Sequence, residues 1–270
     1  MRYVALVLAC GLAAVAAAAP PSAPTDAYPR AAAAYLVAVN GVLLWGREID
    51  RPLPPASLTK LMTALVATED WQPDATLTVS RRAAAATGTR LGLRAGESLR
   101  LGDALDALLV VSANDACLAL AEHVAGSEAA FVARMNARAA ALGLAAMNFA
   151  NACGFDAPGH AASARDLLAL ARVALQVPVI AAAVAKPAID FTTPGKRRFR
   201  RDAANLLIGR VPGAVGTKTG YTGRAGKCLI ARVDRGRDRV ELVLLDAPER
   251  WTAADILITD AYAALAQSRR

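Results

Sequence analysis

Two apolar runs near the start of the chain predict an opening β-hairpin. They cover positions 35–39 and 42–45, and the Asn40-Gly41 pair between them is a strong signal for a tight two-residue turn. A proline-rich stretch at 52–55 then favours extended backbone. Beyond it, apolar side chains recur at helical spacing over 57–69, so we expect a helix to start near its first residue.

The rest of the chain divides into a mainly helical middle and a strand-rich final third. Glycines across 79–97 indicate loops around short elements. The expected helices are 101–126, 133–143, 163–176 and 252–266. The expected strands are 189–192, a short one through Phe199, 215–221, 228–233 and 240–246. This order predicts an α/β (α+β) fold in which helices cover an antiparallel sheet built from both chain ends, with a mostly helical subdomain inserted.

The first nineteen residues have the character of a secretory signal peptide. Arg2 precedes an uncharged run over 3–19 that ends in small residues. Pro, Ala and Ser then dominate 20–31, which is expected to be a flexible lead-in to one domain over 32–266. A retained membrane anchor and a lipoprotein attached at Cys10 are the alternatives to cleavage.

Composition and charge narrow the range of partners. The 270 residues are 55% hydrophobic and carry a formal net charge of +8; loss of the signal peptide would remove Arg2 and Cys10, leaving +7 (8 minus 1) and three cysteines. Cys117, Cys153 and Cys228 match no zinc spacing, so buried free thiols with at most one bridge are expected. A basic exported protein suits an anionic partner such as a cell-wall polymer or a membrane surface, and nucleic acid is not expected as a partner outside the cytoplasm.

Three short motifs stand in order along the chain. They are Ser57-Leu58-Thr59-Lys60, Ser112-Ala113-Asn114 and Lys218-Thr219-Gly220. Each is weak alone, but their ordered occurrence with wide gaps is rare. Lysine usage strengthens them, because only five of the 31 basic residues are lysines and two of the five lie in these motifs. Arginine cannot be deprotonated in a protein whereas lysine can, so these are positions where an amine is needed.

The first motif can supply a nucleophile and its base. A serine hydroxyl must lose its proton as it attacks, so a base within hydrogen-bond reach is required. Helical positions i and i+3 share a face, which places Lys60 beside Ser57. Burial and a second cation, for which Lys218 is the candidate, would lower the pKa of Lys60 from about 10.4 and allow it to accept a proton. The Ser57 amide at the helix start can help stabilise an oxyanion.

With their surroundings, the motifs resemble the low-molecular-mass penicillin-binding proteins, the D-alanyl-D-alanine carboxypeptidases. The resemblance extends over about 33–262 and includes Pro55-Ala56 before the first motif, Asp115-Ala116 after the second, Met135-Asn136, Ala164-Arg165-Asp166-Leu167, and Tyr221-Thr222 followed by Ala225-Gly226. It implies a β-lactamase/transpeptidase-like fold and identifies 32–266 as a penicillin-binding catalytic domain. The chain departs from the family pattern at Ala113, where many relatives have glycine, and in 151–154 and 160–163.

The resemblance implies a role for each motif residue that takes part in bond making. Ser57 would be the acylated nucleophile and Lys60 its base. Ser112 would pass a proton to the leaving amine, and Asn114 would orient amide groups of the substrate.

A second set of residues is implied to bind the substrate. The strand Lys218-Thr219-Gly220 would pair with the peptide along its edge, and Lys218 and Thr219 would meet its terminal carboxylate. The Tyr221 amide would complete the oxyanion hole. Arg250, before the last helix, would assist at the carboxylate.

The function implied is that of a serine-type D-Ala-D-Ala carboxypeptidase that removes terminal D-alanine from peptidoglycan stem pentapeptides. No metal or other cofactor is expected, and β-lactams are expected to be covalent inhibitors. The signal peptide implies a periplasmic or otherwise exported protein. No stable membrane anchor is expected, since the chain ends just after its last predicted helix.

Three other functions remain open. A D,D-endopeptidase of peptidoglycan cross-links would use the same residues on a larger leaving group. A class A β-lactamase is disfavoured because it needs a glutamate to activate water, and no glutamate lies between Glu128 and Glu241. A non-catalytic wall-binding or β-lactam-sensing protein is disfavoured because every reacting group is present.

Several other polar features are expected to be structural. His123 and His160 occur without a Gly-x-Ser-x-Gly pattern, so a Ser-His-Asp triad has little support. Ser163 with Asp166 is typical of a helix capping box. The basic cluster at 196–201 is expected to be a solvated hairpin.

Overall fold

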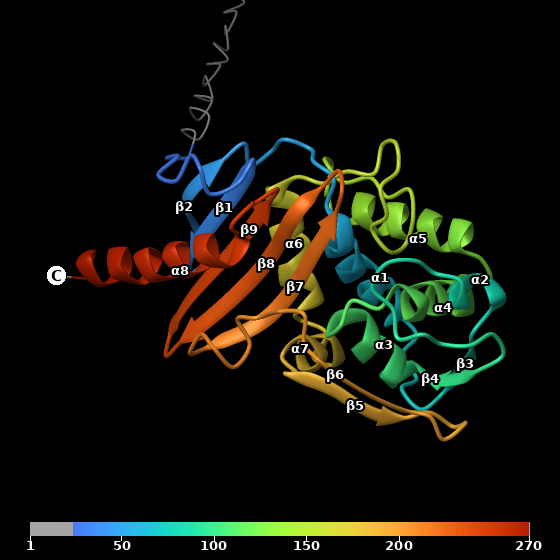
Figure 1. Ribbon diagram of the computed structural model, residues 1–270. Helices are drawn as coiled ribbons and strands as arrows, with labels where there is room; N and C mark the ends of the chain where they lie inside the picture. The colour runs from blue at the N-terminus through green and yellow to red at the C-terminus, as the bar shows by residue number, and fades with distance from the viewer. Residues whose placement is uncertain (1–23, 270) are drawn as a thin grey trace, which may run out of the picture.

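A five-stranded antiparallel sheet forms the centre of the fold (Figure 1). The computed structural model describes residues 24–269 and places the strands in the order β2-β1-β9-β8-β7. Their bounds are β1 Ala34–Val39, β2 Val42–Arg47, β7 Ala214–Thr222, β8 Gly226–Arg235 and β9 Asp238–Leu245. Because β1 pairs with β9, the sheet is assembled from both chain ends, which confirms the predicted fold class. The predicted signal peptide at 1–19 lies outside the described residues.

Helices cover both faces of this sheet (Figure 1). Helix α8 (Arg250–Gln267) packs on one face against β1, β8 and β9, and α6 (Ala164–Ala174) packs on the other. The helical region beside the sheet contains η1 Ala56–Thr59, α1 Lys60–Ala67, α2 Arg81–Ala84, α3 Leu101–Leu109, α4 Asn114–Ala125, α5 Glu128–Ala141 and α7 Pro178–Val184. Two short antiparallel pairs accompany it, β3 Thr76–Thr78 with β4 Ser98–Arg100, and β5 Ala188–Thr192 with β6 Arg198–Asp202.

Alternating side chains of the sheet belong to two hydrophobic layers, one on each face. On β1, Tyr35 and Val37 face α8, whereas Leu36 and Ala38 belong to the core shared with the helical region. Since both faces are covered, all six residues of β1 are buried. This double cover explains why the strand reads as a continuous apolar run instead of an alternation of apolar and polar residues.

The first hairpin forms where the sequence predicts it. Asn40 and Gly41 both have positive φ, 51° and 89°, as the tight turns that suit the twist of a hairpin require. Strands β1 and β2 pair on either side of this turn. The prediction of an opening β-hairpin is therefore confirmed.

The prediction of one continuous helix over 101–126 is wrong. Helix α3 ends at Leu109 and α4 begins at Asn114. Between them Ser112 has a φ of 63°, a left-handed conformation that a right-handed helix cannot contain. The second motif therefore lies at a sharp break between two helices, and the short helix α7 was also missed.

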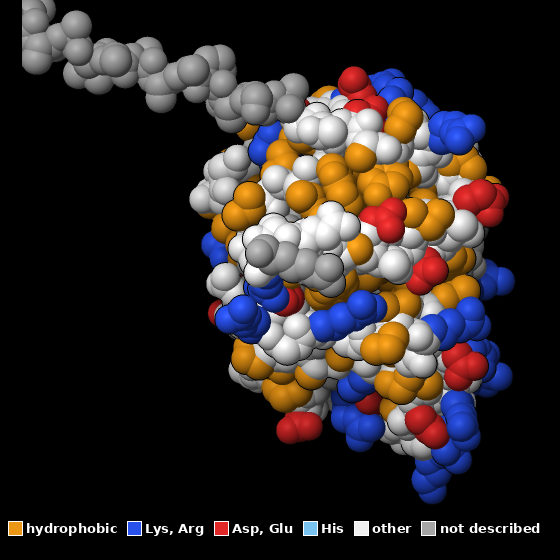
Figure 2. All heavy atoms as spheres, turned by 90° about the vertical axis from the view of Figure 1, so that its left-hand side faces the viewer, with side chains coloured by type: hydrophobic (Ala, Val, Ile, Leu, Met, Phe, Trp, Pro, Cys, Tyr) orange, Lys and Arg blue, Asp and Glu red, His pale blue; other side chains and the backbone are white. Residues whose placement is uncertain are grey.

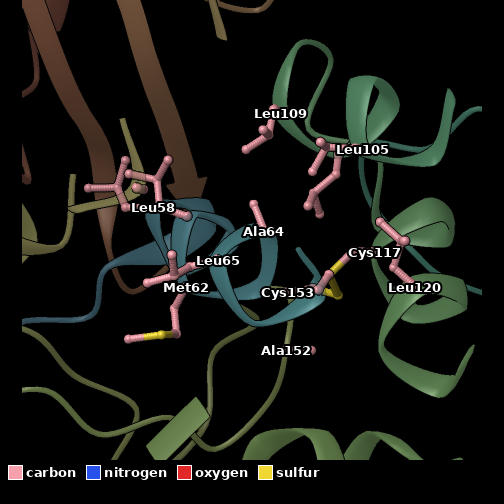
Figure 3. Close-up of a cluster of buried hydrophobic side chains, with 14 of the residues drawn as sticks. Leu58, Met62, Ala64, Leu65, Leu105, Leu109, Cys117, Leu120, Ala152 and Cys153 are labelled. Carbon is pink, nitrogen blue, oxygen red and sulfur yellow. A yellow bond between two sulfur atoms is a disulfide. The ribbon is translucent and has the colours of Figure 1, made fainter. Parts of the chain in front are cut away.

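One disulfide joins two parts of the helical region. Cys117 on α4 is bonded to Cys153 in the loop before α6, with 6.0 Å between their Cα atoms, while Cys228 is a buried free thiol. Figure 3 shows the bond among the buried side chains of α1, α3 and α4. One bridge and one buried free thiol lie within the expectation of at most one bridge, although no spacing rule could predict which two cysteines pair.

The predicted cap of α6 is present in a modified form. The Ser163 hydroxyl accepts a hydrogen bond from the Asp166 N–H at 3.1 Å, as a helix cap should. The Asp166 carboxylate does not close a capping box and instead accepts from the Ala146 N–H at 2.8 Å. The pair therefore fastens the preceding loop to α6 as well as starting the helix.

The surface around α8 mixes basic and apolar side chains. Figure 2 shows Lys and Arg distributed over this face, with hydrophobic side chains gathered between them.

Within residues 24–269, no single helix has the length and hydropathy to cross a bilayer, although two bent pairs, α4 with α5 and α6 with α7, meet that test by length and composition.

Candidate active site

Ser57 lies in a tight turn that leads into α1. It occupies the 3-10 helix η1, and Ala56 before it has a φ of 48°. Two glycines make room for this turn. A Cβ atom on Gly154 would lie 1.9 Å from the Ala56 carbonyl oxygen, and one on Gly220 would lie 3.1 Å from the Ser57 nitrogen. The backbone of β7 therefore approaches the nucleophile candidate as closely as only glycine allows.

The Lys60 amine contacts the Ser57 hydroxyl directly. Its Nζ lies 2.8 Å from Ser57 Oγ, 2.7 Å from Asn114 Oδ1 and 2.7 Å from the Cys153 carbonyl oxygen. The two carbonyl-type oxygens can only accept hydrogen bonds, so each takes one N–H of the amine. In a neutral lysine these are the two available protons, and the remaining lone pair faces the hydroxyl of Ser57.

Burial lowers the pKa of Lys60. The side chain is fully buried, and the loss of solvation lowers its pKa well below the ordinary value, with the positive charge of Lys218 adding to the effect. A lysine with such a pKa can be neutral at physiological pH and accept a proton. The sequence predicted that the pKa of Lys60 is lowered and that burial and the charge of Lys218 are the causes.

The second motif reaches Lys60 through Asn114, the first residue of α4. Its Nδ2 donates to the Thr87 carbonyl at 2.7 Å, which fixes Oδ1 on the side of Lys60. Both polar atoms of the amide are thus engaged, and the geometry gives Asn114 a part in holding the Lys60 amine. Its role toward substrate amides stays a prediction. Ser112 lies in the break before α4 and is almost fully buried.

Asp115 fastens a loop beside this motif. Its buried carboxylate accepts hydrogen bonds from the backbone N–H groups of Leu91, Gly92 and Leu93, at 2.8–3.1 Å. The Asn114 N–H adds a bond to the Thr89 carbonyl at 2.8 Å. The start of α4 therefore holds the loop around 89–93 in place, a role that the sequence pattern did not suggest.

The third motif lies on β7, an outer strand of the sheet. One edge of β7 pairs with β8, so the other edge can accept an extended peptide. Lys218 is buried, and desolvation together with the charge of Arg250 lowers its pKa to about 7. Its Nζ donates to the Thr219 carbonyl at 2.9 Å.

Arg250 lies against the backbone of the third motif. Its Nη1 donates to the carbonyl oxygens of Gly220 and Cys228, both at 2.9 Å, and the guanidinium stacks on Trp251. This arrangement supports β7 from the side of β8. The Tyr221 side chain is 67% exposed, and the expected roles of its amide and of Arg250 toward substrate stay predictions.

A loop histidine supports the turn at Ser57. The N–H of Ala150 donates to His160 Nδ1 at 3.0 Å, so that nitrogen is unprotonated and Nε2 carries the proton. Nε2 lies 2.8 Å from Thr59 Oγ1, whose own hydroxyl donates to the Ala56 carbonyl at 2.8 Å. His160 thus has a structural role, and through Thr59 it acts on Ala56, the residue that precedes the nucleophile candidate.

Comparison with known proteins shows what the whole chain is similar to. Residues 20–249 match the family model of the D-alanyl-D-alanine carboxypeptidases. A D-alanyl-D-alanine carboxypeptidase of Mycobacterium tuberculosis is 34% identical over 226 residues, covering 81% of this chain and 77% of that protein. A D-alanyl-D-alanine endopeptidase of Pseudomonas aeruginosa is 32% identical over 217 residues, covering 79% and 70%.

A solved structure shares the whole fold. The crystal structure of a D-alanyl-D-alanine carboxypeptidase from Mycobacterium tuberculosis superposes with a TM-score of 0.80 at 31% identity, covering 92% of this chain and 95% of that one. The chain spans about half the length of several further curated carboxypeptidases.

Proposed function

The chain belongs to the D-alanyl-D-alanine carboxypeptidase family, and from this premise we propose that it removes terminal D-alanine from peptidoglycan stem pentapeptides through an acyl-enzyme at Ser57. It is a serine peptidase by family. The observation that carries the assignment of the nucleophile is the contact of 2.8 Å between Lys60 Nζ and Ser57 Oγ, in which a buried amine faces the hydroxyl.

Acylation begins with proton transfer from Ser57 to Lys60. As Oγ attacks the carbonyl carbon between the last two D-alanines, its proton passes to the lone pair of Nζ. The backbone N–H groups of Ser57 and Tyr221 stabilise the oxyanion. The peptide C–N bond then breaks as Ser112 hands its proton to the departing amine of D-alanine and takes a proton from Lys60, which becomes neutral again.

Deacylation returns the enzyme to its starting state. Water attacks the ester carbon and gives a proton to the neutral Lys60; the bond to Ser57 Oγ then breaks, and Lys60 returns the proton to Oγ. The product is a stem shortened by one D-alanine. Because β-lactams carry an amide in a strained ring beside a carboxylate, they enter the same acylation step and are expected to inhibit the enzyme covalently.

Substrate recognition is assigned to the edge of β7. An extended peptide can pair with the free edge of the strand, and a carboxylate at its end can meet the buried cation of Lys218 and the hydroxyl of Thr219. This arrangement favours peptides with a free C-terminus, which is the feature that distinguishes a carboxypeptidase substrate.

Rapid hydrolysis of β-lactams is disfavoured by the positions of Glu128 and Glu241, the two glutamates on either side of the long segment that contains no glutamate. One oxygen of Glu128 accepts from the Ala152 N–H and the other pairs with Arg82. Glu241 is held by Arg172 of α6, with its Oε2 2.5 Å from Nη2. Neither carboxylate is free to activate water at the ester.

An exported location follows from action on peptidoglycan, and the disulfide supports it, because disulfides persist mainly in oxidising compartments. We assign the protein to the periplasm or an equivalent space outside the cytoplasmic membrane. Cleavage of residues 1–19 remains part of the proposal.

Two measurements test this function. Purified protein is incubated with a pentapeptide and with cross-linked muropeptides. Free D-alanine supports the carboxypeptidase, and release of uncross-linked monomers supports the endopeptidase that one relative suggests. If neither product forms, both functions are contradicted. Labelled penicillin should attach to the wild type and not to Ser57→Ala. Equal labelling of the two proteins would place the nucleophile elsewhere.

A further inference from the structure

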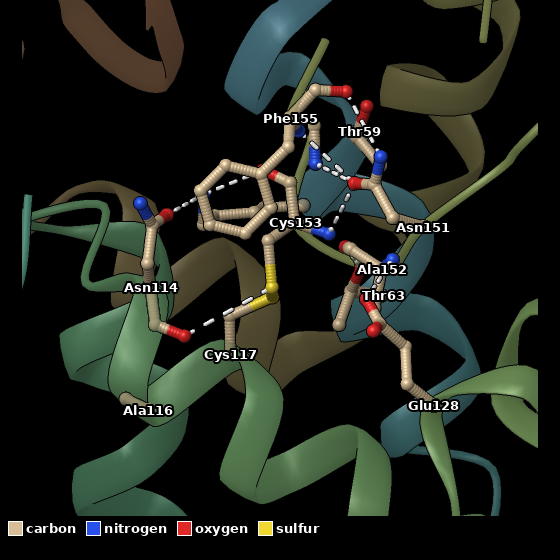
Figure 4. Close-up of a disulfide and its surroundings, with 12 residues drawn as sticks. Thr59, Thr63, Asn114, Ala116, Cys117, Glu128, Asn151, Ala152, Cys153 and Phe155 are labelled. Atoms are coloured by element: carbon tan, nitrogen blue, oxygen red, sulfur yellow. Dashed lines mark hydrogen bonds between the residues drawn. A yellow bond between two sulfur atoms is a disulfide. The ribbon is translucent and has the colours of Figure 1, made fainter. Parts of the chain in front are cut away.

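The Cys117–Cys153 disulfide joins the two elements that hold the amine of Lys60. One acceptor, Asn114 Oδ1, comes from α4, and the other, the Cys153 carbonyl, comes from the loop at 151–155. Cys117 and Asn114 are three residues apart on α4 and therefore share a face of the helix. Figure 4 shows the disulfide directly beside Asn114.

The loop that carries Cys153 has its own set of contacts. Asn151 Oδ1 accepts from the N–H groups of Cys153, Gly154 and Phe155, which stabilises the local turn. The Ala152 N–H donates to Glu128 of α5, and the Ala152 carbonyl accepts from Thr63 of α1. These bonds shape the loop and fix it to α5 and α1, while the disulfide fixes it to α4.

The distance between the two acceptors matters because both must reach one nitrogen. Each lies 2.7 Å from Nζ, and together they take the two N–H groups that leave the lone pair facing Ser57. If the loop moved away from α4, the amine would turn or lose a partner. A misplacement of about 1 Å can cost roughly a hundredfold in rate.

We propose that the Cys117–Cys153 disulfide is a positioning device for Lys60, which sets the distance between its two carbonyl acceptors so that the amine is aimed at Ser57. The proposal rests on the function proposed above for Ser57 and Lys60. Both half-cystines are at most 1% exposed, so the bond is a permanent part of the acylation machinery and not a surface switch.

A bond that only stabilises the fold would give a different signature from one that positions the base. Loss of stability lowers the fraction of folded protein but leaves each folded molecule as active as before. Loss of positioning slows the covalent step in molecules that are folded and have bound ligand normally. The two are separated by measuring the covalent step and the binding step independently.

The experiment compares Cys117→Ser/Cys153→Ser with the wild type and with Cys228→Ser, a matched control that removes a buried thiol without breaking a bond. The full chain without its signal peptide is titrated with labelled penicillin, giving the noncovalent dissociation constant and the acylation rate at saturation. Thermal unfolding gives the folded fraction. If the serine pair fails to fold, Cys117→Val/Cys153→Ala fills the same space with apolar groups and is measured in the same way.

The expected result is an acylation rate lowered by about ten- to a hundredfold per folded molecule, with the dissociation constant changed less than twofold. Cys228→Ser should match the wild type in both. An acylation rate per folded molecule equal to that of the wild type would overturn the proposal and leave the disulfide a purely structural role. Absence of acylation in the wild type itself would instead contradict the proposed function, so the two failures are distinguishable.

Discussion

Lys60 Nζ lies 2.8 Å from Ser57 Oγ. The two residues are three positions apart in the sequence, and their contact spans the boundary between η1 and α1. The contact is local in the sequence, but the other groups that surround the Lys60 amine come from distant parts of the chain. The two carbonyl oxygens that complete the surroundings of the amine come from α4 and from the loop at 151–155. The proposed nucleophile and base are therefore neighbours in the sequence, whereas the surroundings of the Lys60 amine are set by the tertiary fold.

Replacement of Lys60 by arginine should slow acylation strongly. Arginine keeps the positive charge but cannot give up its proton, so Ser57 would lose its base. Loss of a general base slows a reaction by about 10² to 10⁴-fold, and the rate of penicillin attachment to Lys60→Arg measures this. Lys186→Arg, which keeps an exposed pair with Asp106, is the control and should react at the wild-type rate. Normal acylation in Lys60→Arg would exclude Lys60 as the base.

Binding of carboxylate ligands should weaken as the pH rises past about 7. The pKa of Lys218 is lowered to about 7 by desolvation and by Arg250, so the free protein loses the cation above that pH. The dissociation constant of penicillin for the non-reacting Ser57→Ala variant should be flat at low pH and then rise up to about tenfold per pH unit. Ser57→Ala/Lys218→Arg should lose this dependence. A flat profile in Ser57→Ala itself would show that Lys218 does not meet the carboxylate.

The buried charge of Lys218 should cost the protein stability. The folded pKa is about 7 and the ordinary value is 10.5, so between these values the unfolded chain binds the extra proton and stability rises with pH. At or below pH 7 the full cost is present. Lys218→Met should raise the free energy of unfolding at pH 7 by on the order of 2 kcal/mol, and the gain should shrink toward pH 10. Chemical denaturation tests this, with Lys227→Met as a surface control. A destabilised Lys218→Met would contradict it.

Gly154 should tolerate no side chain. A Cβ atom there would lie 1.9 Å from the carbonyl oxygen of Ala56, the residue before Ser57. Gly154→Ala should therefore displace the nucleophile turn, costing about 3 kcal/mol or more and reducing acylation. Gly126→Ala is the matched control, because its φ is also positive but nothing lies within 4 Å. It should cost only the backbone strain of about 1–2 kcal/mol. Equal losses for the two variants would show that the close approach has no consequence.

Sequence patterns predicted the parts of this protein that are encoded locally. The Asn40-Gly41 turn, the apolar runs of the sheet and the i, i+3 spacing of Ser57 and Lys60 each leave a signal within a few residues. The break at Ser112 was missed because the apolar pattern of 101–126 continues through it, and only backbone conformation reveals it. The carbonyl of Cys153 left no signal at all, since every residue carries a carbonyl and only the fold decides which one reaches Lys60.

The protein should lose stability in mild acid because folding holds His160 in its neutral form. Its Nδ1 accepts from the Ala150 N–H and its Nε2–H donates to Thr59, so only the neutral ring satisfies both bonds. Burial lowers its pKa to about 4, below the ordinary value of 6.5. Between these values the unfolded chain binds the additional proton, so stability is lost as the pH falls from 6.5 toward 4.

The size of this effect can be measured against a variant that cannot titrate. For the wild type the loss is on the order of 2–3 kcal/mol over this window, since one pKa unit corresponds to about 1.4 kcal/mol. His160→Gln should be less stable at pH 7, because its amide cannot reproduce both bonds, but its unfolding free energy should fall less steeply below pH 6.5. The exposed His123 supplies the control, since His123→Gln should keep the wild-type slope. If His160→Gln loses stability with the same slope as the wild type, the acid sensitivity originates in other groups and the ring does not hold the turn at Ala56 through its neutral form.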